Sequence, residues 1–134
     1  MTQLRISRAA ALIGVSDDTV RRWVDGGRLA MSLDSSNRQV VDGADLARIA
    51  QEEAAGSRDA LDAGAGARSA RNHFTGLVTR VLSDPVMSQV ELQCGPFRVV
   101  SLISTEAVRE LGLEPGSVAT AVVKATNVAV EARR

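Results

Sequence analysis

The sequence predicts an α+β protein of two small domains, the first mainly α-helical and the second an antiparallel β-barrel. Residues 4–50 show two short helical patterns followed by a strand, a polar turn and a second strand. Residues 68–134 show apolar and alternating runs separated by Pro and Gly, as expected for an antiparallel sheet. The chain has 134 residues, so it suits two domains of about 50 and 65 residues better than one. We place them at residues 1–50 and 68–134.

Two short helices are predicted near the N-terminus. The first lies between Ser7, its expected N-cap, and Gly14, a residue type that readily adopts the left-handed conformation ending many helices. Ser16 is expected to cap a second helix over residues 17–25. Apolar residues of this second helix, Trp23 among them, recur at i, i+3 and i+4 and predict a buried face. We therefore assign Trp23 to the core rather than to a ligand site.

A β-hairpin is predicted after the second helix. Its strands are expected at residues 29–33 and 39–41, with a polar tip at residues 34–38. Asp42 is the expected N-cap of a third helix. Two short helices around a tight turn, followed by such a hairpin, are typical of a helix-turn-helix with a wing.

Residues 4–50 resemble the winged helix-turn-helix of the MerR and excisionase group. The resemblance implies that the second helix enters the major groove of operator DNA and that the wing tip contacts the DNA backbone. The candidate DNA-binding residues are Ser16, Thr19, Arg21, Arg22, Asn37 and Arg38. The alternative interpretation of Arg21 and Arg22 is a solvated helix face.

The charge balance limits any DNA binding. The chain carries 16 basic and 16 acidic residues, for a formal net charge of 0. Residues 1–39 alone hold six arginines against four aspartates, which is a local basic excess. Because DNA affinity depends on phosphate neutralisation, we expect modest binding per copy. The following segment, residues 51–67, is rich in Ala, Gly and Asp and predicts the end of a helix and a flexible linker.

The C-terminal half predicts five strands and one short helix. Residues 87–94 alternate, with Ser88 and Cys94 on the apolar face, and Pro and Gly interrupt the runs on either side. A short helix is expected over residues 105–111, ended by Gly112. The expected strands are residues 73–82, 86–94, 97–103, 117–124 and 126–132.

Two short strings point to an anion site. One is Ser69-Ala70-Arg71-Asn72 and the other is Lys124-Ala125, and Lys124 is the only lysine among the 16 basic residues. A guanidinium fork and a compact ammonium together suit a small dianion, with hydroxyl and backbone N–H groups completing its shell. The alternative is that Lys124 is a solvated residue at a strand end.

Residues 69–131 resemble a Mop domain, the molbindin or TOBE-type unit that binds molybdate. The resemblance rests on the two strings above and on Gly76-Leu77-Val78, Ile103-Ser104-Thr105 and Leu111-Gly112-Leu113-Glu114-Pro115-Gly116. It implies a five-stranded, OB-like antiparallel barrel that binds molybdate, often also tungstate, between paired units. A homo-oligomer, from a dimer up to a hexamer, is therefore expected.

The same resemblance implies the residues of the anion site. One unit would supply Ser69, Arg71, Asn72, Lys124 and Ala125, and its partner would supply Ser104 and Thr105. The family often has a further hydroxyl where this chain has Ala107, and Thr105 or a backbone N–H could replace it. His73 is either an ordinary strand residue or a second contact behind the anion site. Cys94 is expected to be a buried apolar residue.

Several classes of function are not expected. Neither a long apolar run nor an N-terminal apolar region occurs, so we expect a soluble, cytoplasmic protein without a membrane partner. The sequence also shows no phosphate-binding loop, zinc-ligand spacing or nucleophile–base set, so we expect neither an enzyme nor a metal-cation site.

The combined interpretation is a molybdate-responsive DNA-binding regulator, similar in plan to the ModE regulators but with one Mop unit per chain. The alternative is a molybdate or tungstate storage or homeostasis protein, whose N-terminal domain is an interaction or assembly module. A third option keeps DNA binding and gives the barrel a purely architectural role.

Overall fold

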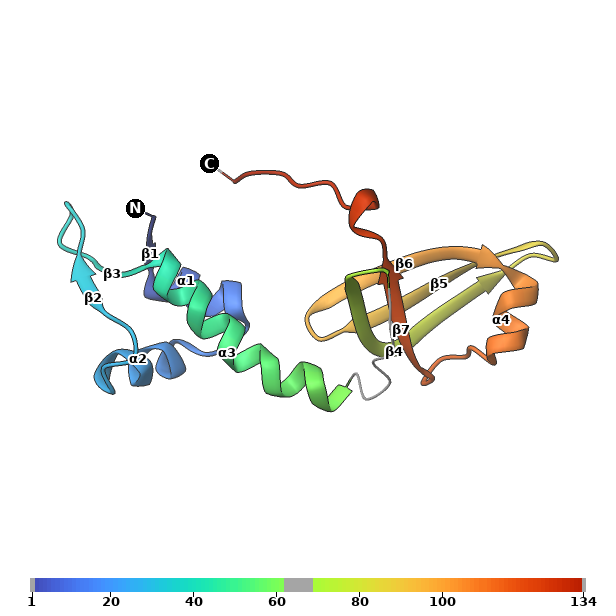
Figure 1. Ribbon diagram of the computed structural model, residues 1–134, viewed down its shortest axis with the longest axis horizontal. Helices are drawn as coiled ribbons and strands as arrows, with labels where there is room; N and C mark the ends of the chain where they lie inside the picture. The colour runs from blue at the N-terminus through green and yellow to red at the C-terminus, as the bar shows by residue number, and fades with distance from the viewer. Residues whose placement is uncertain (1, 62–68, 134) are drawn as a thin grey trace. The chain divides into compact units, whose positions relative to one another are not determined.

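The computed structural model describes residues 2–61 and 69–133. They divide into an N-terminal unit, Met1–Leu61, and a C-terminal unit, Asp62–Arg134 (Figure 1). Both helices and strands occur, which confirms the α+β class. No helix in the described part of the chain is long and apolar enough to cross a membrane.

The two predicted N-terminal helices are present as α1 (Ile6–Ile13) and α2 (Asp17–Asp25). α1 ends at Gly14, whose φ of 82° is left-handed as predicted, and the Ser16 hydroxyl caps α2 by accepting the backbone N–H of Thr19 at 3.2 Å. The expected cap at Ser7 is wrong, because α1 already begins at Ile6. Ile6, the first residue of the helix, is 6% exposed and packs in the core, and Arg5 takes the N-cap position.

Three short strands form the sheet of the N-terminal unit, in the order β1-β3-β2. The predicted hairpin is β2 (Met31–Leu33) and β3 (Gln39–Asp42), and the unpredicted strand β1 (Gln3–Arg5) pairs antiparallel with β3. At the hairpin tip the Asp34 carboxylate accepts the backbone N–H groups of Ser36 and Arg38 at 2.8 and 2.9 Å. These bonds, Arg38 first, lower the pKa of Asp34 and fix the tip.

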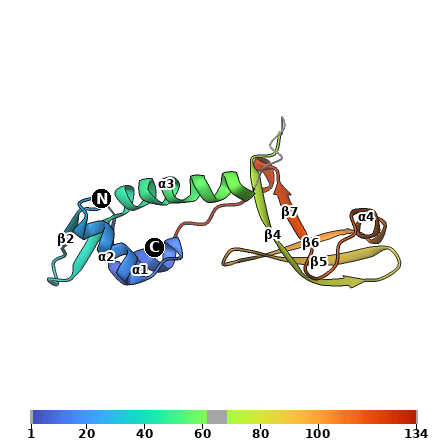
Figure 2. The ribbon, with the colours of Figure 1, turned by 90° about the horizontal axis from the view of Figure 1, so that it is seen from below.

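Helix α3 (Gly43–Leu61) is longer than predicted, and Figure 2 shows it as one continuous helix. Asp42 caps it as expected, since its carboxylate accepts the backbone N–H of Asp45 at 3.1 Å. Residues 51–61 are helical, so the predicted linker is wrong over this range, and residues 62–67 lie outside the described residues. The segment holds good helix formers, and Glu52 adds ion pairs to Arg28 and Arg48 at 2.9 and 3.0 Å.

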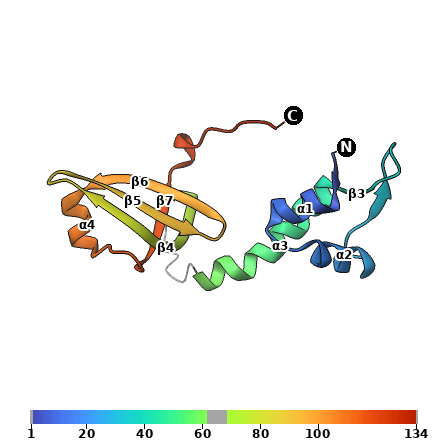
Figure 3. The ribbon, with the colours of Figure 1, turned by 180° about the vertical axis from the view of Figure 1, so that it is seen from behind.

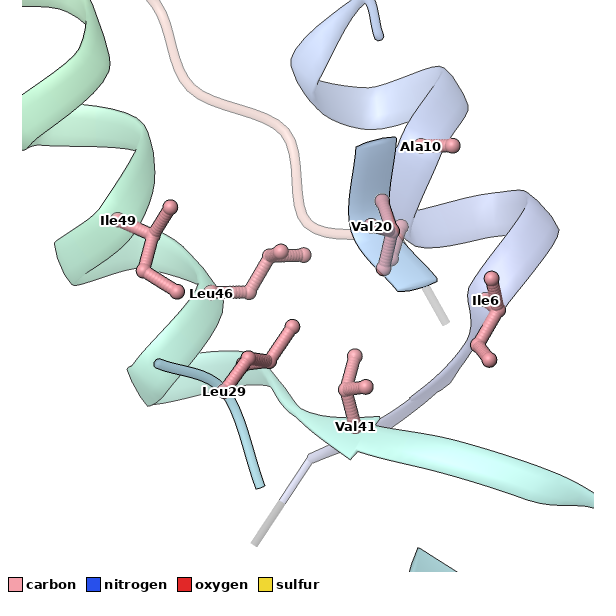
Figure 4. Packing of buried hydrophobic residues seen from close by; sticks show 8 residues of the cluster. Ile6, Ala10, Val20, Leu29, Val41, Leu46 and Ile49 are labelled. Atoms are coloured by element: carbon pink, nitrogen blue, oxygen red, sulfur yellow. The ribbon is translucent and has the colours of Figure 1, made fainter. Parts of the chain in front are cut away.

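The N-terminal core joins α1, α2, β3 and α3 (Figure 4). Trp23 packs against its rim and carries the Arg28 guanidinium 5.6 Å from its ring, in line with the predicted core role. The buried residues are Ile6, Ala9, Ala10, Val20, Leu29, Val41, Leu46 and Ile49. The helices and hairpin expected from the sequence are thus present, while the identity of this unit as a winged helix-turn-helix stays a prediction.

The C-terminal unit is a curled antiparallel sheet in the order β6-β5-β4-β7 (Figures 1 and 3). Four predicted strands are confirmed with small shifts at their ends. They are β4 (Asn72–Ser83), β5 (Met87–Cys94), β6 (Phe97–Ser104) and β7 (Val118–Val123). The first half of β4 pairs with β7 and its second half pairs with β5, so one bent strand carries both partners.

Gly76 lies where β4 bends. A Cβ atom on Gly76 would stand 2.1 Å from the carbonyl oxygen of Gln93 in β5, so only glycine allows β4 and β5 to approach this closely. A register shift between Val78 and Arg80 adds to the curl.

The predicted fifth strand at residues 126–132 is wrong. The chain instead forms a 3₁₀ turn, η1 (Ala125–Asn127), closed by the backbone N–H of Asn127 donating to the Lys124 carbonyl at 2.9 Å. This turn directs residues 128–133 away from the edge of β7, and an extended segment forms a strand only beside a partner (Figure 1). The described residues therefore form a four-stranded curled sheet, not a five-stranded barrel.

The predicted short helix is α4 (Thr105–Leu111), capped by Ser104 and ended by Gly112 at a φ of 65°. Cys94 lies in the core with Val78, Val90, Leu92 and Val108, and burial raises the pKa of its thiol. This agrees with the expected apolar role of Cys94.

Candidate functional sites

The pairing of β4 with β7 brings the two predicted anion-binding strings together. Asn72 lies opposite Val123, and its side-chain Nδ2 donates to the Val123 carbonyl at 3.1 Å. Arg71 directly precedes Asn72 and Lys124 directly follows Val123, so the two residues flank the last pair of this antiparallel register. Both side chains are exposed, and neither forms an ion pair within the described residues. Two positive charges therefore stand at the same end of one strand pair, with Ser69 and Ala125 beside them.

His73 steadies the first string. It pairs with Val122 in β7, and its ring Nε2 donates to the Ala70 carbonyl at 2.7 Å. The half-buried ring thus holds the chain just before β4, which fits a supporting position behind Arg71.

Ser104 and Thr105 lie at the other end of β4. Ser104 pairs with Met87 at the start of β5, and its hydroxyl accepts the backbone N–H of Ala107 at 3.0 Å. Arg71 lies just before the first residue of β4, Asn72, whereas Ser104 lies near its last residue, Ser83, which pairs with Ser88 of β5. The two predicted halves of the anion site are therefore separated by the length of β4. The structure therefore brings together Ser69, Arg71, Asn72, Lys124 and Ala125, and it leaves Ser104 and Thr105 apart from them.

Thr105 differs from the expectation that its hydroxyl faces an anion. It is 4% exposed, its hydroxyl donates to the Asp84 carbonyl at 2.7 Å, and its backbone N–H donates to the Val86 carbonyl at 2.9 Å. The hydroxyl and the backbone N–H of Thr105 therefore both donate to carbonyl groups within the C-terminal unit. Thr105 braces the loop that carries Ser104, and the exposed Ser104 is the residue able to meet a ligand.

A chain of hydroxyl groups behind this loop was not predicted. Ser88 is 1% exposed, and its oxygen lies 2.7 Å from the Ser83 hydroxyl and 2.8 Å from the Thr105 hydroxyl. Because Thr105 donates to a carbonyl, Ser88 must donate to Thr105 and accept from Ser83. The available signal was Ser88 itself, a polar residue on the apolar face of its strand.

The turn before β5, whose Asp84 and Val86 carbonyls accept the two bonds from Thr105, is itself closed by a carboxylate. The Asp84 carboxylate accepts the backbone N–H groups of Met87 and Val86, each at 2.7 Å. These bonds, Met87 first, lower the pKa of Asp84.

The two edge strands of the sheet leave an apolar cavity of about 440 Å³ between them. Its lining includes Val99 and Ile103 of β6, Ala119 and Val123 of β7, and Leu113. Each edge strand has a hydrogen-bonded neighbour on one side only. Exposed valines occur in the segment after η1, where Val128 is 48% and Val130 is 90% exposed.

The candidate DNA-binding residues of α2 form a connected polar surface. The Thr19 hydroxyl lies 3.0 Å from the Ser16 hydroxyl and accepts Arg22 Nη2 at 3.1 Å. Arg21 Nη1 donates to Gln39 Oε1 of β3 at 3.5 Å, so α2 and the hairpin meet on this side of the unit. The remaining candidates, Asn37 and Arg38, are exposed at the hairpin tip, where Asn37 has a φ of 61°. Among the side chains that the structure describes, those of residues 2–55 and 69–133, no group of three or more His, Cys, Asp or Glu is arranged to hold a metal ion.

Comparison with known proteins gives matches to part of the chain. A family model described as the TOBE domain matches residues 68–130. Molybdenum-pterin-binding protein 2 of Clostridium pasteurianum is 40% identical over 63 residues, which span 46% of this chain and 93% of that protein. A probable molybdenum-pterin-binding protein of Haemophilus influenzae is 41% identical over 63 residues, spanning 46% of this chain and 91% of that protein.

A similar solved structure is that of MopII from Clostridium pasteurianum in a form designated apo2. It is 39% identical, with 49% of this chain and 100% of that chain covered and a TM-score of 0.46. The resemblance to a TOBE-type domain predicted from the sequence is confirmed, while the resemblance to ModE regulators stays a prediction. Through residues 68–130, this chain belongs to the TOBE-domain family.

Proposed function

We propose that this chain is a cytoplasmic, molybdate-responsive DNA-binding regulator. The observation that carries the anion-binding part is the meeting of Arg71 and Lys124 at one end of the β4–β7 pair. Two cations that form no ion pair with any residue the structure describes suit a tetrahedral dianion. The guanidinium fork and the ammonium bind oxyanions through charge-assisted hydrogen bonds. The similar proteins named above are described as molybdenum-pterin-binding, which supports molybdate as the ligand, with tungstate as a close substitute.

A second copy of the chain would complete the site. Ser104 lies at the far end of β4 from Arg71, so one chain offers both halves of a site but does not bring them together. A homo-oligomer in which Ser104 of one copy faces Arg71 and Lys124 of another would supply hydroxyl and cationic contacts to one anion.

The edges of the sheet support the same oligomer. In a single chain, water contacts two apolar surfaces: the lining of the cavity between β6 and β7, and the side chains of Val128 and Val130. Burying the valines of one copy against the sheet of another would remove this surface from water and give the segment after η1 a strand partner.

The N-terminal unit supports the DNA-binding part. α2 presents Arg21 and Arg22 outward because Val20 and Trp23 pack inward, and the hairpin tip presents Asn37 and Arg38. Anion binding between C-terminal units would favour one arrangement of the oligomer and so one spacing of its DNA-binding units. The effect on DNA affinity can then be no larger than the difference in molybdate affinity between the two arrangements.

The alternative is a molybdate storage or homeostasis protein. It is favoured by the similar proteins, which are described as binding proteins and match this chain over 63 residues, 93% and 91% of their own lengths. In that case the N-terminal unit is an interaction or assembly module.

A fluorescence anisotropy titration of a labelled duplex from the chain's own upstream region separates the two functions. The regulator should bind the duplex, with an affinity that molybdate changes and an equal concentration of sulfate does not. Molybdate binding by calorimetry without any DNA binding would leave the storage function in its place.

A further inference from the structure

Two groups of arginines stand out in the N-terminal unit. Arg28 and Arg48 form ion pairs with Glu52 and Glu53 of α3, at 2.6 to 3.0 Å. Arg5, Arg21 and Arg38 form no ion pair within the described residues. Since Glu52 and Glu53 of α3 neutralise only the first group, a positive surface remains although the formal net charge of the chain is 0.

The second group lines a single groove of about 400 Å³, which we call the arginine groove. Its cations come from three elements: Arg5 ends β1, Arg21 lies on α2, and Arg38 precedes β3. Strand pairing of Arg5 with Val40 and the bond from Arg21 to Gln39 hold these elements side by side. The full lining is Arg5, Ile6, Ser7, Asp17, Arg21, Arg38 and Gln39.

We propose that the arginine groove binds a phosphodiester group of the DNA backbone. This inference rests on the proposed DNA-binding function and adds to it a phosphate site with Arg5 and Ser7, neither of which is among the DNA-binding residues predicted from the sequence. Guanidinium groups bind phosphate oxygens through paired charge-assisted bonds, and a serine hydroxyl is a common phosphate donor. The groove also adjoins the outer face of α2, so a DNA strand that meets Arg22 passes close to it.

Two acidic groups lie near these cations and limit their effect. Asp17 lines the groove, and Asp34 is held at the hairpin tip by backbone N–H bonds, with the charges of Arg38 and Arg5 close enough to stabilise its carboxylate. The carboxylate of Asp34 is structural because it closes the hairpin tip. The carboxylate of Asp17 accepts no hydrogen bond from described residues and would repel a phosphate. The site therefore predicts opposite effects for two nearby substitutions.

The test is the salt dependence of DNA binding by the full chain, measured by anisotropy between about 50 and 200 mM salt. The probes are the duplex from the chain's own upstream region and a mixed-sequence duplex of equal length. Arg5→Ala should weaken both about tenfold or more at low salt and lower the slope of log K against log salt by about one. Arg5→Lys should keep most of the slope, and Asp17→Asn should strengthen binding to both duplexes.

Arg48→Ala is the matched control, because it removes the same charge from the ion-paired side of the unit. It should leave the slope unchanged, and circular dichroism should show that all variants keep the wild-type fold. Wild-type slope and affinity in folded Arg5→Ala would overturn the phosphate site while leaving the regulator proposal intact. Effective competition by free phosphate or molybdate at micromolar concentration would also overturn it, because the groove would then be a small-anion site.

Absence of any salt-dependent DNA affinity in the wild type would instead overturn the regulator proposal, and the arginine groove as a DNA site with it. A preference for single-stranded RNA over both duplexes would also contradict the inference. The site would be established if Arg5→Ala binds DNA more weakly than the wild type, Asp17→Asn binds it more tightly, and Arg48→Ala binds it with an unchanged salt dependence.

Discussion

The hydroxyl oxygens of Ser88 and Thr105 lie 2.8 Å apart in the interior of the C-terminal unit, and their bond ties β5 to the first turn of α4. Thr105 uses its own hydrogen for the Asp84 carbonyl, so Ser88 acts as the donor. The loop that carries Ser104 is thus held by buried groups that themselves face no ligand.

We predict that Ser88→Ala destabilises the C-terminal unit by about 1–3 kcal/mol, because it leaves a buried hydroxyl of Thr105 without a donor. The same change should weaken molybdate binding by loosening the loop at Ser104. Denaturant unfolding followed by circular dichroism, combined with Thr105→Val in a double-mutant cycle, measures the coupling. Ser101→Ala on the neighbouring strand is the control, since Ser101 forms no side-chain hydrogen bond among the described residues. Strict additivity of Ser88→Ala and Thr105→Val would contradict the brace.

Asp84 predicts a dependence of stability on pH. Its pKa is lowered in the folded state by the backbone N–H groups of Met87 and Val86, so its charge stabilises the fold above the ordinary aspartate pKa of about 3.9. This stabilisation is lost as the pH falls through the lowered pKa. Asp84→Asn keeps an acceptor oxygen but not the charge, so it should melt earlier than the wild type at neutral pH and approach it in acid.

Differential scanning calorimetry across this pH range tests the Asp84 prediction. Glu114→Gln, an exposed change in the same unit, should follow the wild type throughout. A constant difference between Asp84→Asn and the wild type at every pH would show that the charge of Asp84 does not contribute.

The proposed anion site predicts that Arg71→Ala and Lys124→Ala each weaken molybdate binding strongly. Each removes one of the two cations that flank the last pair of the β4–β7 register, Asn72 and Val123. Charge-assisted bonds of this kind contribute about 1.5–3 kcal/mol, or roughly tenfold to more than a hundredfold in affinity. Isothermal titration calorimetry gives the values, with Arg80→Ala as an exposed arginine elsewhere on β4. Unchanged affinity in both site variants would refute the assignment.

The proposed oligomer predicts that Val130→Asp produces smaller assemblies. Val130 is 90% exposed in the single chain, and a charge at this position would have to be desolvated if the valine packs against a second copy. Light scattering, with and without molybdate, reports the assembly size. Ala129→Asp is the control, because neighbouring residues of an extended segment face opposite sides. Equal assemblies in the wild type and Val130→Asp would exclude this contact.

Local features of the sequence predicted most of the fold. The predicted caps at Ser16 and Asp42 and the breaks at Gly14 and Gly112 lie directly beside the helices that they begin or end. Such contacts can be recognised from spacing alone. In the same way, the Pro and Gly residues that interrupt the apolar runs predicted the ends of four strands in the C-terminal unit.

Long-range contacts account for the differences. β1 exists because it pairs with β3, and residues 51–61 stay helical where Glu52 meets Arg28 from far earlier in the chain. The valines at 128 and 130 alternate as a strand does, yet no described strand pairs with them. For the anion site, the motifs predicted Arg71 and Lys124, while the burial of Thr105 depends on Ser88 and Asp84, which no motif includes.

The outer face of α2 gives the last prediction: Arg22→Ala should abolish specific DNA binding and leave molybdate affinity and assembly size unchanged. Arg22 donates to the Thr19 hydroxyl, while Arg21 donates to Gln39, so Arg22 is held on α2 and Arg21 is turned toward the hairpin. Loss of a base contact costs about 1–3 kcal/mol and relaxes sequence preference. Loss of a phosphate contact weakens all sequences alike. Anisotropy on the upstream duplex and on a mixed-sequence duplex distinguishes these cases: Arg22→Ala should erase the difference between the duplexes, and Arg21→Ala should weaken both equally. Identical behaviour of both variants and the wild type on the upstream duplex would show that α2 is not the reading helix.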